Sequence, residues 1–300
     1  MPNGPLGATR TESPMSFNTL ISAEQLATLL ADTAANVLVC DCSYDLTNPA
    51  AGSASYRHAH IPGAVYVDLE RTLSGQKTGR NGRHPLPAPA SLAEALSGLG
   101  ANTDTQLVCY DGAGGMFAAR LWWLARWLGH DRVAVLDGGL AAWQAAGQPT
   151  EQGDGRTPAR ADFPVRAPLV ATVDYDTVLA NVARPTRVVL DARAADRFRG
   201  ENETLDAVGG HIPNARNRFF RDNLGADGRF KSPERLRAEF SAVAGHTDGS
   251  ALIAQCGSGV TACHNLLAME VAGIPGAALY PGSWSEWSSR PGAPIATGSH

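Results

Sequence analysis

The sequence predicts an α/β protein made of two similar domains, each with a mainly parallel sheet covered by helices on both faces. Three landmarks of the first half recur in the same order in the second half, about 150 residues later. Short apolar runs alternate with helical patterns in both halves, which is typical of parallel sheets. Self-similarity of this kind indicates the number of domains before other features are considered.

The repeated landmarks are an apolar strand that ends in an aspartate, a His-Ile-Pro unit, and a turn followed by a tryptophan. Residues 38–41 match 188–191, residues 60–62 match 211–213, and residues 136–143 match 280–287. A proline-rich stretch with little periodicity lies between the two halves, as is typical of a linker. We therefore expect a disordered leader over residues 1–16, domains over 17–148 and 169–292, a linker over 149–168 and a tail over 293–300.

The first half shows apolar strands that alternate with helical patterns. Ser22 can cap a helix that runs to about residue 34, with Leu26 and Leu29 on one face. Residues 71–90 are rich in Gly, Pro and charge, which favours a long surface loop. The other expected elements are strands over 37–41, 106–110 and 132–136, helices over 92–99 and 116–128, and a short helix carrying Trp143.

The second half is organised around a cysteine that follows a buried strand. Residues 251–254 form a short apolar run, residues 257–259 read Gly-Ser-Gly, and a helix over 260–272 ends before Gly273. Cys256 therefore lies where the strand ends and the helix begins. Because ligands of parallel sheets bind at the carboxyl ends of the strands, we expect the functional site at this turn.

Cys256 is the expected nucleophile. Backbone N–H groups at such a turn point inward, and the positive end of the helix dipole favours a thiolate. Gly257 and Gly259 let the loop curl without Cβ obstruction, while the side-chain hydroxyls of the loop can donate hydrogen bonds. The predicted catalytic and substrate-binding loop thus comprises Cys256, Gly257, Ser258, Gly259, Val260 and Thr261.

The first half differs from the second at the equivalent turn. Alignment of the two turns places Asp111 at the position of Cys256, with residues 112–114 facing 257–259. A carboxylate cannot act as a sulfur nucleophile, and its charge opposes an anionic substrate. We therefore expect the first domain to be catalytically inactive and the second domain to carry the chemistry.

Phosphatases also use a cysteine loop, and they close it with an arginine six residues after the cysteine to bind phosphate through two hydrogen bonds. That position here is Ala262. Because the loop lacks its phosphate ligand, the sequence argues against a phosphatase or an arsenate reductase.

The remaining cysteines are expected to be buried. Cys263 falls on the apolar stripe of its helix, and Cys40, Cys42 and Cys109 lie in or beside strand runs. The pair Cys40 and Cys42 lacks a second ligand pair at zinc spacing, so we expect no metal site, and nothing indicates an organic cofactor. Five cysteines, an odd number in a chain of 300 residues, favour a reducing cytoplasm over a disulfide framework.

The composition limits the classes of partner. The formal net charge is -4 at pH 7, which argues against a chain that binds nucleic acid as a whole. No apolar run approaches the roughly 18 residues of a membrane helix, and residues 1–16 lack the apolar region of a secretory signal. We expect a globular cytoplasmic protein that acts on a small molecule.

Three arginines follow the strand that ends at Asp191. Arg193 is expected to form a structural salt bridge with Asp191. Arg197 is a candidate for binding an anionic substrate, and Arg199 is a further candidate. Anion recognition is assigned to this segment because the cysteine loop itself contains no basic residue.

Two histidines and two tryptophans have more than one possible role. His60 and His211 occupy matching His-Ile-Pro units, which favours a shared structural role such as packing a turn. Alternatively, His60 reaches across the interdomain cleft and polarises Ser258. Trp284 and Trp287 are candidates for a wall of the pocket.

The cysteine loop, the arginine segment before it, the paired His-Ile-Pro units and the closing Gly-Ser-Trp-x-x-Trp resemble the tandem-domain rhodanese sulfurtransferases over roughly residues 17–290. The resemblance implies two rhodanese-like domains, of which the first is inactive. It further implies that Cys256 takes up a sulfane sulfur as a persulfide and passes it to cyanide or a thiol, thioredoxin among them. By motif position, Arg197 looks like the substrate-binding arginine.

The resemblance leaves two sulfur donors open. Thiosulfate enzymes of the family typically place two basic residues after the cysteine, whereas 3-mercaptopyruvate enzymes typically have the neutral Cys-Gly-Ser-Gly-Val-Thr found here. The neutral loop favours 3-mercaptopyruvate, whose thiol would be deprotonated by Ser258 with His60. The mercaptopyruvate enzymes usually carry a second arginine nine residues after the first, where this chain has Asp206. Arg199 or Arg193 then has to substitute for it, or thiosulfate is the donor.

The predicted function is a cytoplasmic sulfurtransferase that works through a Cys256 persulfide. Its expected donor is 3-mercaptopyruvate, with thiosulfate as the alternative. A hypothesis of another class is a non-catalytic persulfide carrier that docks a partner. None of these functions calls for a metal, an organic cofactor, a nucleic acid or a membrane.

Overall fold

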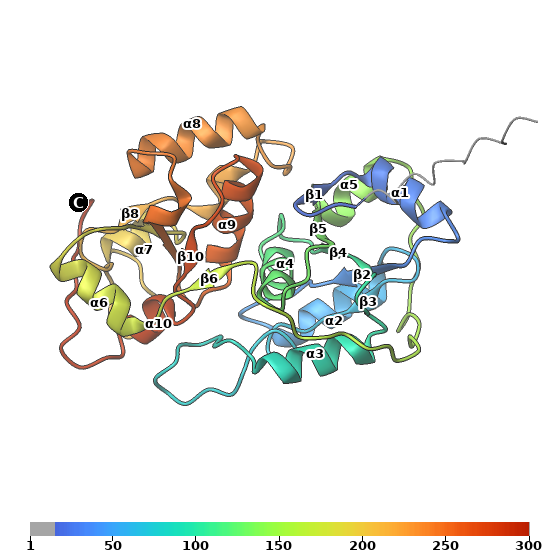
Figure 1. Cartoon of the computed structure of the whole chain (residues 1–300), viewed down its shortest axis with the longest axis horizontal. Helices are drawn as coiled ribbons and strands as arrows, with labels where there is room; N and C mark the ends of the chain where they lie inside the picture. The colour runs from blue at the N-terminus through green and yellow to red at the C-terminus, as the bar shows by residue number, and fades with distance from the viewer. Residues whose placement is uncertain (1–15, 300) are drawn as a thin grey trace, which may run out of the picture.

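The computed structural model describes residues 16–299 and contains two five-stranded sheets, each flanked by helices (Figure 1). The first sheet is built from strands before residue 137 and the second from strands after residue 170. The leader predicted over residues 1–16 lies outside the described residues, except for Ser16. Between the sheets, residues 149–168 contain no helix, and Phe163 within them is buried.

The two sheets correspond strand by strand. The first consists of β1 (Leu20–Ile21), β2 (Val37–Asp41), β3 (Val65–Tyr66), β4 (Gln106–Tyr110) and β5 (Val133–Leu136), and the second of β6 (Ala171–Thr172), β7 (Val188–Asp191), β8 (Arg216–Asn217), β9 (Leu252–Gln255) and β10 (Ala278–Leu279). The order β1-β5-β4-β2-β3 is repeated as β6-β10-β9-β7-β8, and all pairs are parallel. The duplicated α/β fold predicted from the three landmarks is confirmed.

Helices lie on both faces of each sheet. Those of the first domain are α1 (Ala23–Ala31), α2 (Pro49–His58), α3 (Pro89–Gly98), α4 (Ala118–Trp127) and α5 (Gly139–Ala145). Those of the second are α6 (Tyr175–Ala183), α7 (Ala195–Arg199), α8 (Pro233–Ala244), α9 (Thr261–Val271) and α10 (Ser283–Trp287), with 3₁₀ turns η1 (Phe220–Asn223) and η2 (Gly249–Ala251).

The start of α1 follows from a capping box. Ser22 Oγ accepts a hydrogen bond from Gln25 N at 3.2 Å, and Gln25 Oε1 accepts one from Ser22 N at 2.9 Å. These two bonds satisfy N–H groups that have no partner within the helix. The helix ends at Ala31, earlier than predicted, because Asp32 adopts an extended backbone conformation.

Helices α4 and α9 pack against each other and join the two domains into one apolar core. Trp122 and Trp123 on α4 are fully buried. Each helix follows the turn at the carboxyl end of its central strand, so the two equivalent turns meet at the domain interface. Consistent with this, His264 Nε2 on α9 lies 3.0 Å from the carbonyl oxygen of Gly114 in the first turn.

The turn of the first domain is occupied by its own carboxylate. Asp111 Oδ1 accepts hydrogen bonds from the backbone N–H groups of Ala113 at 2.7 Å and Gly115 at 2.9 Å. Its Oδ2 accepts from those of Phe117 at 2.7 Å and Ala118 at 2.8 Å. Asp111 is 1% exposed. The side chain therefore fills the position that an anionic ligand would take, in addition to repelling one.

The expectation of a surface loop over residues 71–90 is only partly right. Residues 71–88 lack helices and strands, and α3 begins at residue 89, but the loop extends from the first domain toward α10 of the second (Figure 1). Arg83 N donates a hydrogen bond to Ser285 Oγ at 3.0 Å, and His84 is 3% exposed. Its Gly, Pro and charge content indicated the lack of regular structure, but not the burial of residues 73–74, 84–85 and 87 on either side of its exposed middle part.

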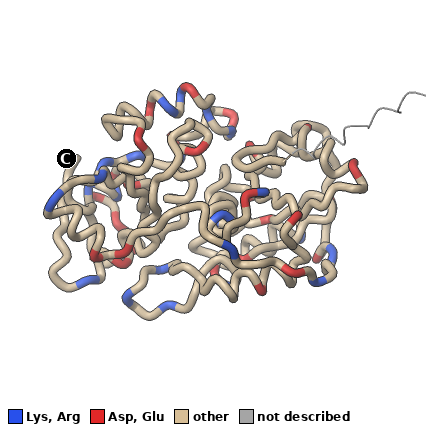
Figure 2. Tube along the Cα trace, in the orientation of Figure 1, with Lys and Arg blue, Asp and Glu red and all other residues tan. Residues whose placement is uncertain are grey.

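Charged residues of both signs are interspersed over the described part of the chain. In Figure 2, basic and acidic positions are scattered over both domains and occur together along α8.

Within residues 16–299, no helix is both long enough and apolar enough to cross a membrane.

Replacing Asp111 with alanine is expected to lower the free energy of unfolding by roughly 3 kcal/mol, because four buried N–H groups lose their acceptor. Urea unfolding monitored by circular dichroism measures the change. Asp104→Ala is the matched control, since Asp104 is exposed in the loop before β4. Its effect should stay within about 0.5 kcal/mol. Equal unfolding midpoints for the two variants would contradict the structural role of Asp111.

Candidate active site

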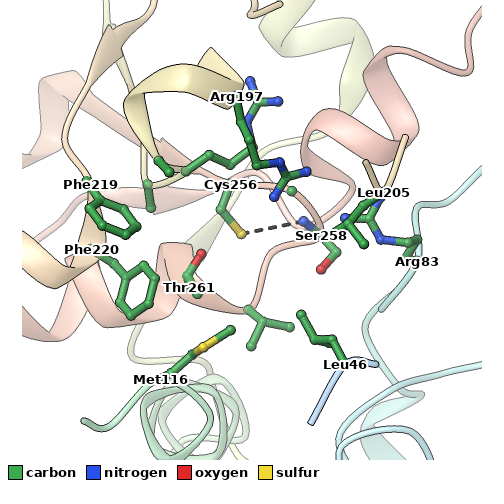
Figure 3. Close-up of a pocket in the computed structure, with 15 residues that line it drawn as sticks. Leu46, Arg83, Met116, Arg197, Leu205, Phe219, Phe220, Cys256, Ser258 and Thr261 are labelled. Atoms are coloured by element: carbon green, nitrogen blue, oxygen red, sulfur yellow. Dashed lines mark hydrogen bonds between the residues drawn. The ribbon is translucent and has the colours of Figure 1, made fainter. Parts of the chain in front are cut away.

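A cavity of about 140 Å³ lies at the carboxyl edge of the second sheet, where the first domain meets it (Figure 3). Cys256, directly after β9, lies on its wall and is 2% exposed. Leu46, Arg83 and Met116 of the first domain also line the cavity. The strand end singled out from the sequence thus faces a cavity that both domains build.

The sulfur of Cys256 accepts hydrogen bonds from the backbone of its own loop. Sγ lies 3.1 Å from Gly259 N and 3.5 Å from Ser258 N, and the second contact is drawn in Figure 3. The N–H of Cys256 donates to Ser283 Oγ at 3.1 Å. These amide dipoles stabilise negative charge on the sulfur without a basic side chain in the loop.

Gly259 is required for the shape of this loop. Its φ is 78°, in the region that L-residues with a side chain rarely adopt. A Cβ placed there would lie 2.5 Å from the carbonyl oxygen of Pro281. The curl predicted from the glycines is therefore present. Val260 and Thr261, which follow, line the cavity together with Ser258.

Ser258 is the first member of a hydrogen-bonded chain that crosses the domain interface. Ser258 Oγ lies 2.7 Å from His84 Nδ1, and His84 Nε2 lies 3.2 Å from Glu70 Oε1. Because the Glu70 carboxylate can only accept, Nε2 carries the proton of the neutral ring and Nδ1 accepts from the serine hydroxyl. Hydroxyl, imidazole and carboxylate thus follow one another in the order used to move a proton.

Burial lowers the pKa of His84 to about 4, against the opposing effect of Glu70. The ring is therefore neutral near pH 7 and can take up a proton from the hydroxyl. A charged imidazolium would have no lone pair for Ser258. The low pKa consequently keeps a lone pair on Nδ1 available to accept the hydrogen bond of the Ser258 hydroxyl.

His60 does not reach the site, and its predicted contact with the loop serine is wrong. The side chain is fully buried in the first domain, with Nδ1 2.7 Å from Tyr56 O and Nε2 3.0 Å from a carboxylate oxygen of Glu151. His211 is held in the same way, with Nδ1 2.9 Å from Phe198 O. Each histidine also forms an isolated bridge to a later segment. The structural interpretation of the two His-Ile-Pro units is confirmed.

Sequence reasoning missed both His84 and Glu70. The repeat drew attention to paired histidines, whereas His84 has no counterpart between β8 and α8 of the second half. The sequence did contain one signal for His84, because a histidine that occurs in only one copy of a duplicated fold is not explained by the shared structure. Glu70 carried no comparable signal, because many acidic residues lie on the surface of this chain.

The three arginines after β7 have different surroundings. Arg193 is 3% exposed and its Nη2 lies 2.7 Å from Asp191 Oδ2, so the predicted salt bridge is confirmed. Arg197 lines the cavity and pairs with Glu203 at 2.8 Å. Arg199 is not among the lining residues, and the prediction that it binds substrate is not supported. Residues two apart in α7 point in different directions, so Arg199 is turned away from the site.

Arg199 pairs instead with Glu201 at 2.7 Å on the surface. Asp206, the acid that left the choice of sulfur donor open, also lies in a place that the sequence did not predict. Asp206 does not line this cavity; its carboxylate contacts Arg83 and lies 3.5 Å from Arg197 Nη2. The loop over 71–90 thus brings a further arginine, Arg83, to the site.

Arg120 on α4 is a buried cation behind the catalytic loop. It is fully buried, and its Nη1 donates to Gly259 O at 3.1 Å. Its Nη2 donates to His84 O at 3.1 Å and to Leu73 O at 3.4 Å. One side chain of the first domain therefore ties the cysteine loop to the segment that carries the histidine.

Trp284 and Trp287 do not line the cavity, and their predicted role as its wall is wrong. Both are fully buried in a separate apolar cluster of the second domain. The guanidinium of Arg193 lies 4.7 Å from the ring centroid of Trp284. Trp284 therefore supports the buried salt bridge, because the Arg193 cation stacks on its aromatic face.

All five cysteines are free and buried. Burial raises the pKa of Cys263 to about 12, and its Sγ lies 3.3 Å from the carbonyl oxygen of Gly259. This agrees with its prediction as a core residue. Within the described part of the chain, no group of three or more His, Cys, Asp or Glu side chains is placed to hold a metal ion.

The chain matches the Rhodanese family, described as a rhodanese-like domain, over residues 22–146 and again over 174–290. A "Probable 3-mercaptopyruvate sulfurtransferase" of Pseudomonas aeruginosa is 49% identical over 286 residues, covering 95% of this chain and all of that protein. The thiosulfate sulfurtransferase of Mus musculus is 38% identical over 258 residues, covering 84% of this chain and 85% of that protein.

Solved structures show the same arrangement. The 3-mercaptopyruvate sulfurtransferase from Leishmania major superimposes with a TM-score of 0.81 at 30% identity, covering 92% of this chain and 76% of that one. SseA from Escherichia coli, described as a 3-mercaptopyruvate sulfotransferase, gives a TM-score of 0.77 at 33% identity, covering 90% of this chain and all of that one. With two matched domains and relatives that span nearly its whole length, this chain belongs to the rhodanese family.

Proposed function

We propose that this protein is a sulfurtransferase that carries a sulfur atom on Cys256. The observation that carries the proposal is the position of Cys256 Sγ, which accepts from two loop amides at the edge of a small cavity. A persulfide is a sulfur anion one atom longer than the thiolate, so the same converging dipoles stabilise it. The two half-reactions follow a ping-pong scheme, in which donor and acceptor use the site in turn.

The donor that we propose is 3-mercaptopyruvate. The Cys256 thiolate attacks the donor sulfur, the carbon–sulfur bond breaks, and its electron pair passes to the enolate of pyruvate. The proton of the donor thiol moves to the enolate carbon, so that the products are pyruvate and a Cys256 persulfide anion. Ser258, with His84 as base, is placed to take the thiol proton and return it.

Three observations favour this donor. The loop has no basic residue, which suits a donor with one carboxylate, and the relay from Ser258 to Glu70 has a task only if the donor carries a thiol proton. Relatives named for 3-mercaptopyruvate cover nearly the whole chain. Thiosulfate remains the second candidate, because relatives named for it also match most of the chain.

In the second half-reaction an acceptor attacks the outer sulfur of the persulfide. With cyanide the products are thiocyanate and the Cys256 thiolate, which restores the enzyme. Thiols, including a thioredoxin, are acceptors of the same chemical class, since each supplies a nucleophile that cleaves the sulfur–sulfur bond. We place the reaction in the cytoplasm, where free buried cysteines remain reduced.

Replacing Cys256 with serine is expected to reduce turnover with either donor by at least about 1,000-fold, because no other residue carries the sulfur. Assays with cyanide as acceptor measure this loss, and intact mass spectrometry detects a persulfide on the wild-type chain after donor alone. For the wild type we expect a higher kcat/KM with 3-mercaptopyruvate than with thiosulfate. The reverse order would make thiosulfate the donor.

Ser258→Ala and His84→Gln are expected to lower kcat/KM for 3-mercaptopyruvate by about 100-fold. The same variants should lose less than about tenfold with thiosulfate, which has no thiol proton to remove. Thiosulfate thus serves as an internal control for damage to the loop. Equal losses with both donors would argue against a proton relay.

The neutrality of His84 is tested by NMR of histidine-labelled protein, with the His84 signals assigned by comparison with His84→Gln. Because burial lowers the pKa to about 4, below the ordinary 6.5, the ring should remain neutral as the pH falls from about 7.5 to about 5. The nitrogen shifts should show a proton on Nε2 throughout. A titration midpoint near 6.5 would be inconsistent with a buried, neutral base.

A further inference from the structure

Gly257 marks the point where two guanidinium groups from different domains meet. A Cβ built on Gly257 would lie 2.8 Å from Arg83 Nη2 and 3.7 Å from Arg197 Nη1. The φ of Gly257 is not in the left-handed region, so space rather than backbone conformation calls for glycine here. Both arginines line the cavity beside Cys256, as Figure 3 shows.

Each arginine is held by a carboxylate that leaves one terminal nitrogen available. Glu203 binds Nε and Nη2 of Arg197, at 3.2 and 2.8 Å, and Asp206 binds Nη1 of Arg83. Among the described residues, Arg197 Nη1 and Arg83 Nη2 have no hydrogen-bond partner. Arg83 Nη2 is also the atom nearest to a Cβ at Gly257, and Arg197 Nη1 lies 3.7 Å from that Cβ, as does Nη2 of the same side chain. The free donors of both arginines therefore converge on one place.

Asp206 does not line the cavity that contains Cys256. It lines a neighbouring cavity with Lys77 and Ser289, and its side chain is 7% exposed. The carboxylate therefore neutralises the outer side of the Arg83 guanidinium and restricts its rotation. Asp206 in this position orients the Arg83 guanidinium, and its carboxylate does not face an anion bound in the cavity beside Cys256.

We propose that Arg83 Nη2 and Arg197 Nη1 together bind the carboxylate of the sulfur donor, with Asp206 and Glu203 as positioning residues. This inference rests on the proposed sulfurtransferase function and assigns Arg83, on the first domain, as a determinant of donor specificity. The loop amides then receive the sulfur end of the donor, while the two guanidinium groups beside Gly257 receive its anionic end. Two charge-assisted bonds to one carboxylate fix its orientation as well as its affinity.

The test is the variant Arg83→Met, which keeps the length of the side chain and removes its charge and donors. We expect KM for 3-mercaptopyruvate to rise about 10- to 100-fold, the effect of losing a hydrogen bond to a charged group. The KM of an uncharged acceptor, 2-mercaptoethanol, should stay within about twofold. Arg83→Lys, which retains one charged donor, should give an intermediate KM.

Arg80→Met is the matched control, because Arg80 lies on the same loop and is exposed. It should leave both KM values unchanged. Arg197→Met should raise the donor KM as Arg83→Met does. A rise in both donor and acceptor KM with Arg83→Met would indicate a disturbed loop and would overturn the assignment.

Binding of pyruvate, which carries the carboxylate but no transferable sulfur, separates this inference from the proposed function. Calorimetry on Cys256→Ser should show pyruvate binding that weakens about 10- to 100-fold when Arg83→Met is added. If the wild type forms a persulfide but Arg83→Met changes neither KM nor pyruvate affinity, the inference fails and the function stands. If no persulfide forms while pyruvate binding still depends on Arg83, the function fails and the anion site stands.

Discussion

The convergence of backbone N–H groups at the turn after a central strand is the constraint on which both halves of this protein depend. Such a turn gathers donors that the following helix cannot satisfy, so it requires an acceptor. In the first domain the carboxylate of Asp111 is that acceptor, with four N–H groups around it. In the second domain the sulfur of Cys256 takes the same place, 3.1 Å from Gly259 N. One geometry therefore gives a closed structural turn in one copy and a cysteine sulfur at the wall of a cavity in the other.

The domain without the nucleophile still builds part of the site, because α4 packs on α9 and brings the two turns face to face. Three of its side chains contact the catalytic loop or lie against it. His84 bonds to Ser258, Arg120 bonds to the carbonyl of Gly259, and Arg83 lies beside Gly257. The packing of two helices thus decides which polar groups surround the sulfur, and both domains line the cavity beside it.

Acidic residues around this site orient cations and the imidazole. Glu203 occupies two nitrogens of Arg197, and Glu70 sets the proton of His84 on the nitrogen away from Ser258. Asp206 does the same for Arg83 from outside the cavity. An aspartate at position 206 argues against an anionic donor when it is considered alone. The Asp206 carboxylate is paired with Arg83, however, and a carboxylate that is already paired contributes little repulsion to a neighbouring anion. Asp206 therefore does not argue against an anionic donor.

Local patterns were sufficient for the duplicated α/β fold, for the position of Cys256 at the end of a strand, for the salt bridge of Arg193 and for the place of Arg197 near the cavity. Apolar periodicity, the strand-turn-helix order and salt bridges between near neighbours are all properties of short segments. His60 was singled out because its motif recurs in the second half, yet recurrence reflected a shared structural contact. His84 lies 174 residues from Ser258 in a loop without regular structure, and Arg83 lies beside it. That His84 and Arg83 lie against the cysteine loop was decided only when the domains packed, because no pattern within a short segment encodes contacts across their interface.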